Sequence, residues 1–226
     1  MTARRCERRH YAEVFIKRLQ TQWLMVMHKL SNKTAWIFDL DGTLTIPVHD
    51  FAHMRRELGM PADADILDTI AATQAELRKE LTGKLDRLEA FYAAKAAPAL
   101  GVKELLKYLA DNECKLGIFT RNTKEMAVLS LEAIGIAQYF ADQAIIGRDD
   151  APHKPNPQGL LRLLGDWQMT VKDAVMVGDF KFDLEVGRAA GTATVHVNED
   201  PRRWPELTDY HYSTLFDLHQ GLNPSQ

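Results

Sequence analysis

Residues 35–43, Ala-Trp-Ile-Phe-Asp-Leu-Asp-Gly-Thr, decide the fold of this chain. The four apolar residues predict a short buried strand, and Gly42 predicts a tight turn just after it. Asp39 and Asp41 are two positions apart, and alternate residues of an extended segment point to the same side. Both carboxylates are therefore expected to reach one site beyond the end of the strand.

A pair of carboxylates in this position suits phosphoryl chemistry. Asp39 is the candidate nucleophile that attacks phosphorus. Asp41 is the candidate general acid and base, which protonates the leaving oxygen and later takes a proton from water. Because two close carboxylates repel each other, a divalent cation is a natural third component. Gly42 would let backbone amides approach phosphate oxygens. The alternative interpretation is an acidic turn after a buried strand.

A second motif, Thr120-Arg121-Asn122, follows the apolar residues Ile118-Phe119, and its three residues are candidates for binding the substrate phosphate. Thr120 would end a strand and open a helix, where its hydroxyl and the adjacent amides can hold a phosphoryl oxygen. Thr120 could instead be a plain N-cap, or Asn122 could be the cap and leave Thr120 free for phosphate. Arg121 could lie near the phosphate or near an acidic substrate, or it could point into solvent.

Two further motifs supply a cation and two more carboxylates. Lys154 precedes Pro155 and Pro157, which predict a helix start, and its charge would neutralise a transferring phosphoryl group. Asp179 follows the apolar run 175–177 and is a candidate Mg²⁺ ligand. Asp183, one helical turn later, would face the same site, or it is a helix N-terminal charge favoured by the dipole.

In this order and spacing, the four motifs resemble the haloacid dehalogenase superfamily. The closest resemblance is to its subfamily IA of Mg-dependent phosphatases, which have a helical C1-type cap and are phosphoglycolate-phosphatase-like. The resemblance implies that the Asp39 carboxylate and the Asp41 main-chain carbonyl bind Mg²⁺ together with Asp179. It gives Asp183 either a water-mediated metal contact or a hydrogen bond that positions Lys154.

The alternation of strands and helices after residue 100 predicts a parallel sheet covered on both faces. The fold class is therefore α/β, a Rossmann-like three-layer sandwich with a small all-helical cap inserted after the first strand. We expect helices at 49–58, 63–81 and 84–97, with a break at Thr82-Gly83. The expected domains are a basic, helical N-terminal extension at 1–33, a core hydrolase domain at 34–45 and 99–226, and a cap at 46–98 that covers the site as a lid.

Composition narrows the partners. The chain has 226 residues and a net charge of −3, which gives no general basic face for nucleic acid. No apolar run approaches the roughly 18 residues of a membrane span. Two distant cysteines, Cys6 and Cys114, indicate reduced thiols in the cytoplasm. The expected partner is a small-molecule phosphate ester, with neither nucleic acid nor membrane, and the expected state is a monomer or homodimer.

The leading hypothesis is a Mg-dependent phosphatase that acts through an aspartyl-phosphate at Asp39, on a substrate that could resemble phosphoglycolate. The alternatives are a phosphomutase, a haloacid dehalogenase and a non-catalytic phosphate-binding protein. A dehalogenase needs neither Asp41 nor Mg²⁺, so Asp41 argues against it. Five residues of the cap could meet a substrate, although solvated helix charges are the simpler interpretation: His49, His53, Arg55, Arg56 and Lys84.

Overall fold

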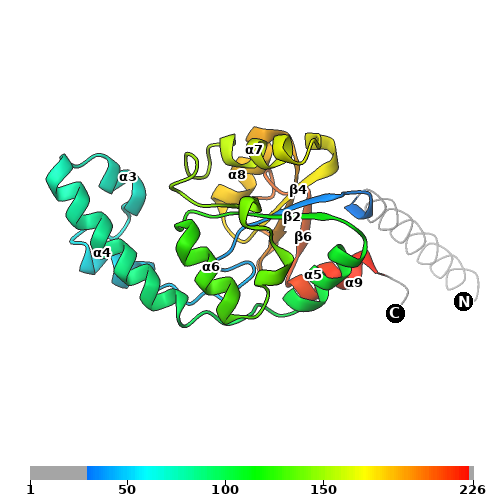
Figure 1. The fold of residues 1–226 in the computed structure, drawn as a ribbon, viewed down its shortest axis with the longest axis horizontal. Coiled ribbons are helices and arrows are strands. Elements are labelled where there is room, and N and C mark those ends of the chain that lie inside the picture. The colour runs from blue at the N-terminus through cyan, green and yellow to red at the C-terminus, as the bar shows by residue number, and fades with distance from the viewer. Residues whose placement is uncertain (1–29, 224–226) are drawn as a thin grey trace, which may run out of the picture.

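A parallel β-sheet forms the centre of the molecule. The computed structural model describes residues 30–223, and within them the sheet has six strands in the order β3-β2-β1-β4-β5-β6 (Figure 1). Each strand pairs in parallel with its neighbours. The strands are β1 (Ala35–Phe38), β2 (Lys115–Phe119), β3 (Ile145–Ile146), β4 (Ala174–Gly178), β5 (Ala193–Val197) and β6 (Tyr210–Tyr212).

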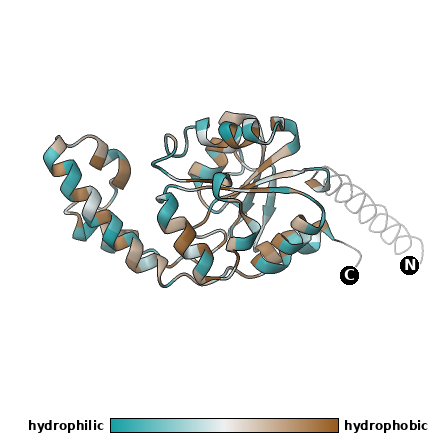
Figure 2. Cartoon of the chain, viewed as in Figure 1, coloured by the Kyte–Doolittle hydropathy of each residue, from teal (hydrophilic) through white to brown (hydrophobic). Residues whose placement is uncertain are grey.

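Helices cover both faces of this sheet, which confirms the predicted three-layer α/β sandwich. One face carries α5 (Val102–Asp111), α6 (Lys124–Ala133) and α9 (Leu215–Leu222), and the other carries α7 (Gln158–Asp166) and α8 (Lys181–Ala190) (Figure 1). Short 3-10 turns connect them: η1 (Ala137–Tyr139), η2 (Asp142–Ala144) and η3 (Val171–Asp173). The covering helices carry both hydrophilic and hydrophobic residues, as helices that bury one side must (Figure 2).

Strand β1 explains why both faces are covered. All four of its residues are buried. Trp36 and Phe38 belong to the hydrophobic cluster that includes residues of α5, α6 and α9. Ala35 and Ile37 point the other way, into the cluster that includes residues of α7 and α8. A strand that is apolar on both sides is stable only between two helical layers.

Three helices lie between β1 and α5 in the chain: α2 (Phe51–Glu57), α3 (Ile66–Ala71) and α4 (Ala75–Ala93), here called the cap helices. Figure 1 shows α3 and most of α4 to one side of the sheet and its covering helices. The cap helices share a small hydrophobic cluster of their own, made of Met54, Leu58, Ile66, Ile70, Leu81, Leu85 and Tyr92. The domain limits at 45/46 and 98/99 stay a prediction, and residues 1–29 of the predicted extension lie outside the described residues.

The predicted helix break at Thr82-Gly83 is wrong. Helix α4 continues through Gly83, and the chain breaks instead between α3 and α4, where the Thr73 hydroxyl donates to the Ile70 carbonyl at 2.7 Å. Leu81 and Leu85 are both buried in the cap cluster on either side of the glycine. Their packing offsets the roughly 1 kcal/mol that a glycine costs inside a helix.

The topology of the sheet sets the place of the site. In the register, Phe38 of β1 lies opposite Ile118 of β2 and Val177 of β4, so these strands end side by side. The Asp39 amide continues the pairing by donating to the Val177 carbonyl at 2.9 Å. The chain passes from β1 to β2 and β3 on one side, and then crosses back past β2 and β1 to form β4 on the other side of β1. The strand order therefore reverses next to β1. Ligand sites in open parallel sheets lie at the carboxyl ends of the strands at such a switch point.

Among the described residues, we find no helix with both the length and the apolar character of a membrane span.

Candidate active site

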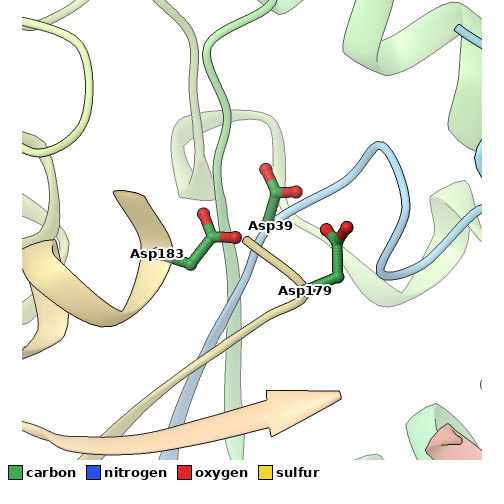
Figure 3. A group of neighbouring side chains, drawn as sticks. All are labelled: Asp39, Asp179 and Asp183. Carbon is green, nitrogen blue, oxygen red and sulfur yellow. The ribbon is translucent and has the colours of Figure 1, made fainter. Parts of the chain in front are cut away.

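Three carboxylates meet at the ends of β1 and β4. Asp39 follows β1, Asp179 follows β4, and Asp183 lies in the first turn of α8. Each offers an oxygen atom, and these oxygens lie within 4.8 Å of one another (Figure 3). Burial, together with the charges of neighbouring carboxylates, raises the pKa of Asp179 to about 8 and that of Asp183 to about 6. Three of the acids that the sequence singled out therefore lie at one point, where they repel one another.

Lys154 reaches the same point from the loop before α7. Its side chain is 2% exposed, and its Nζ donates to Oδ1 of Asp39 and to Oδ1 of Asp183, both at 2.5 Å. Burial alone would lower the Lys154 pKa, but the two carboxylates outweigh it and raise the pKa. The second oxygen of Asp183 accepts the Phe180 amide at 3.0 Å. Because both of its oxygens have partners, Asp183 fits the predicted role of positioning Lys154.

Asp41 is not one of the three clustered carboxylates. Its Oδ2 accepts a hydrogen bond from Asn122 Nδ2 at 3.2 Å, and its Oδ1 lies 3.4 Å from Nδ1 of His49. Burial raises the pKa of Asp41, which favours a protonated carboxyl that can act as an acid. The expectation of Asn122 as the helix cap is wrong, because the Thr123 side chain caps α6 by accepting the Met126 amide at 3.2 Å.

The turn after β1 is fitted to Asp179. Gly42 has a φ of +93°, and a Cβ atom at this position would lie 2.7 Å from Oδ2 of Asp179. The Thr43 hydroxyl donates to Oδ1 of the same carboxylate at 3.1 Å. The absence of a side chain at Gly42 therefore allows both the turn and the close approach of Asp179. Its predicted contact with phosphate stays a prediction.

This donor set fits a divalent cation. The cluster offers only carboxylate oxygens, the ligands that Mg²⁺ takes together with water and phosphate. The raised pKa values of Asp179 and Asp183 mark a surplus of negative charge that a cation would relieve. The Asp41 carboxylate is not part of the cluster, and the predicted contribution of the Asp41 main-chain carbonyl stays a prediction.

Thr120 and Arg121 lie at the end of β2, beside the carboxylates. Thr120 is 1% exposed, lines the cavity, and accepts the Asn122 amide through Oγ1 at 3.1 Å. It is not the cap of α6, so its hydroxyl proton can serve a phosphoryl oxygen. Nη2 of Arg121 lies 2.7 Å from both carboxylate oxygens of Asp65, which caps α3. Arg121 of the core is thus ion-paired with Asp65 of the segment that forms the cap helices, a partner that no pattern in the sequence indicated.

A cavity of about 530 Å³ opens between this centre and the cap helices. Of the five cap candidates, His49 and Arg55 line it. His49 was expected to be solvated, but its side chain is only 5% exposed, stacks on Phe51 and lies tilted against Tyr92. The other three do not line the cavity. His53 contacts Tyr92, Arg56 is exposed, and Lys84 pairs with Glu80 at 2.7 Å on the helix surface.

Sequence reasoning also missed a second link between the core and the cap helices. Arg148, in the loop after β3, donates from Nη1 to both oxygens of Glu89 and from Nη2 to Asp86, all at 2.7 Å. Burial raises the pKa of Glu89 to about 7, even though Arg148 opposes this shift. Glu89 therefore takes the buried side of α4, whereas Phe91 on the same helix is 51% exposed.

Comparison with known proteins agrees with this geometry. The family model described as haloacid dehalogenase-like hydrolase matches residues 36–197. Pyrophosphatase PpaX of Listeria monocytogenes is 31% identical, over 73% of this chain and 82% of its own length. A phosphoglycolate phosphatase of Vibrio parahaemolyticus is 32% identical, over 70% of this chain and 80% of its own. The crystal structure of a putative haloacid dehalogenase-like hydrolase from Bacteroides fragilis shares the fold, with a TM-score of 0.70 at 20% identity, over 82% of this chain and 99% of that one.

Proposed function

Since this chain belongs to the haloacid dehalogenase-like hydrolase family, we propose that it is a phosphatase that hydrolyses small-molecule phosphomonoesters with the help of Mg²⁺. One observation carries the proposal. Lys154 Nζ holds Oδ1 of Asp39 at 2.5 Å, and so fixes this carboxylate at the end of β1 with its other oxygen available for attack. A second carboxyl group, Asp41, lies on the same turn with a pKa raised by burial.

The reaction takes two steps. In the first, a carboxylate oxygen of Asp39 attacks phosphorus, and the bond from phosphorus to the ester oxygen breaks. Asp41 gives its proton to the departing oxygen, so the alcohol leaves neutral. In the second, water attacks the phosphorus of the aspartyl-phosphate, Asp41 takes a proton from that water, and the bond to Asp39 breaks to release inorganic phosphate.

The other residues hold and balance charge. Lys154 restrains Asp39 and lies where it can balance the charge of the phosphoryl group. The Thr120 hydroxyl is placed to donate to a phosphoryl oxygen. Asp39 and Asp179 would hold the metal ion. Asp183 would act indirectly, through its hydrogen bond with Lys154. When bound, Mg²⁺ supplies positive charge that lets an anionic ester approach anionic carboxylates.

The test is phosphate release from a panel of phosphomonoesters, with and without Mg²⁺. We expect release by the wild type to require a divalent cation and Asp39→Asn to lose at least about a thousandfold in kcat. Asp142→Asn is the matched control, because Asp142 is 80% exposed and pairs with Lys124 on the surface. Retained turnover in an Asp39→Asn protein with native circular dichroism would overturn the proposal.

The relatives leave the substrate open. Two of them are similar to this chain to the same degree, but one is named a pyrophosphatase and the other a phosphoglycolate phosphatase. A phosphoglycolate-like substrate, a cytoplasmic location and a monomeric or homodimeric state stay predictions of the sequence. The alcohol that leaves must therefore be argued from the cavity itself.

A further inference from the structure

We propose that the ester cleaved at this site has an uncharged, apolar leaving group that carries an aromatic ring, and not a carboxylate. The inference rests on the proposed function, because it concerns the alcohol released when Asp39 attacks phosphorus. It follows from the walls of the cavity beyond the catalytic centre, which combine exposed aromatic rings with an arginine that is already paired with a carboxylate.

Apolar side chains face the cavity from both sides. Phe51 and Leu67 come from the cap helices, and Phe180 and Phe182 come from the start of α8. Phe51 is 52% exposed and Phe180 is 45% exposed, so each ring has free surface. Phe180 and Phe182 meet edge to face, with centroids 5.3 Å apart. A ring entering between these walls would bury apolar area on both of its faces.

Arg121, a cation that lines the cavity, is already paired with a carboxylate. Away from the catalytic centre, the lining also includes Arg55, which donates to the Ala64 carbonyl at 2.8 Å, and Glu89, which is paired with Arg148. Arg121 lies 2.7 Å from both oxygens of Asp65 and stacks on Phe182, 4.4 Å from the ring centroid.

Asp65 is a carboxylate that keeps its charge near neutral pH. Burial would raise the pKa of Asp65, but the Asp68 amide and Arg121 outweigh burial and lower it. Asp65 therefore stays ionised and holds Arg121. To pair with Arg121, a carboxylate on the leaving group would have to displace Asp65, so it would gain no net attraction from Arg121.

The size of the cavity agrees with a larger alcohol. A volume of about 530 Å³ lies in the range of pockets that enclose drug-sized ligands. The two-carbon leaving group of phosphoglycolate would fill only a small part of this volume, whereas a phenyl-bearing alcohol would fill more of it.

Three esters of primary alcohols separate these possibilities: 2-phenylethyl phosphate, ethyl phosphate and 2-phosphoglycolate. Because all three release a primary alcohol, differences in their kcat/KM report contacts of the leaving group and not its chemical reactivity. We expect 2-phenylethyl phosphate to exceed ethyl phosphate by at least about tenfold in kcat/KM, and 2-phosphoglycolate not to exceed ethyl phosphate.

The outcomes distinguish this inference from the function beneath it. Turnover of 2-phosphoglycolate equal to or faster than that of 2-phenylethyl phosphate overturns the inference and leaves the phosphatase intact. Absence of turnover of all three esters and of p-nitrophenyl phosphate, with Mg²⁺ present and the protein folded, overturns the proposed function and the inference with it.

A pair of phenylalanine variants tests the aromatic wall. Phe51→Ala removes a ring that lines the cavity, and we expect it to lower the ratio of 2-phenylethyl to ethyl phosphate kcat/KM by about fivefold or more. Phe91→Ala is the matched control, because Phe91 is equally exposed, at 51%, but does not line the cavity. Equal ratios in the two variants would overturn the assignment of this wall to the leaving group.

A pair of aspartate variants tests the neutralised cation. Asp65→Asn keeps a good N-cap for α3 but removes the charge that holds Arg121. We expect it to raise kcat/KM for 2-phosphoglycolate by about tenfold. Asp63→Asn also removes one negative charge from the lining and has no contact with Arg121 recorded in the structure, so its gain should be smaller. Equal gains would show that Arg121 is not held back by Asp65.

Discussion

Gly42 and Asp179 show how closely the residues at the site constrain one another. The left-handed backbone of Gly42 could tolerate a side chain only with strain, and the nearest obstacle to a Cβ atom is a carboxylate oxygen that is expected to bind metal. The glycine that lets the chain turn after β1 therefore also lets this turn approach Asp179 at the end of β4.

This leads to a prediction for two glycines with similar backbones. Gly42→Ala should lower the free energy of unfolding by about 2–4 kcal/mol and weaken Mg²⁺ binding, because the new methyl group displaces Asp179. Gly59→Ala has a similar φ, +67°, but open space around the new atom, so it should cost about 1 kcal/mol. Chemical denaturation measures both variants. Equal losses would show that Asp179 does not crowd Gly42.

The acidic cluster predicts how the protein responds to metal. Mg²⁺ should raise the Tm of the wild type by about 5 °C or more at saturation, because it binds the folded cluster and relieves its repulsion. Asp179→Asn should raise the Tm measured in EDTA and abolish the response to Mg²⁺, since it removes one of the repelling charges. Thermal denaturation at constant ionic strength checks both effects. A variant with the full Mg²⁺ response would remove Asp179 from the metal site.

At the residue scale, the sequence located the acids and Lys154 but not the contacts of Arg121. Asp39 and Asp179 each follow an apolar strand, and parallel strands bring their ends together whatever the loops do. Asp65, the partner of Arg121, comes from an inserted helix 56 positions away. No periodicity links those two positions, so only the packing of the cap helices against the core reveals the pair.

At the scale of elements, α4 shows packing that overrides local preference. Gly83 was read as a break, yet the helix continues because Leu81 and Leu85 share one cluster. Gly83→Ala should therefore raise the free energy of unfolding by about 0.5–1 kcal/mol, since only Arg87 approaches the new methyl group, at 3.7 Å. Urea denaturation measures this. A loss of stability would mean that this position needs the freedom of glycine.

Helix α4 also carries a pH-dependent contribution through Glu89. The pKa of Glu89 is about 7 in the folded protein, above its ordinary value of 4.5, because burial outweighs Arg148, while Asp86 and Asp41 add repulsion. Between these pH values, the folded protein keeps a proton that the unfolded chain has lost. This residue therefore makes the free energy of unfolding fall as the pH rises through that window.

Glu89→Gln should remove this dependence. Relative to the wild type, the variant should gain about 3 kcal/mol in free energy of unfolding between about pH 4 and about pH 8. Glu80→Gln, on the exposed side of the same helix, is the control and should show no such gain. Urea denaturation across the pH range provides the comparison. A Glu89→Gln curve parallel to that of the wild type would contradict the shifted pKa.

At the scale of the whole molecule, the sheet and its order of layers were predictable, but the cavity between the core and the cap helices was not. Continuous apolar strands such as β1 require helices on both faces, and this alone gives the sandwich. The cavity depends on the position of the cap helices relative to the core. Two ion pairs between residues distant in sequence, Arg121–Asp65 and Arg148–Glu89, hold that position. The aromatic wall of Phe51 and Phe180 exists only after that placement.

The division of labour between Asp39 and Asp41 is the central claim, and one experiment isolates it. The ester p-nitrophenyl phosphate releases a good leaving group that needs no acid, so Asp41→Asn should still complete the first step and stall in the second. We expect a burst of about one p-nitrophenol per enzyme, with the phosphoryl group on the peptide that contains Asp39 when the reaction is quenched in acid. Continued turnover without a burst, or a phosphoryl group on any other residue, would contradict the account.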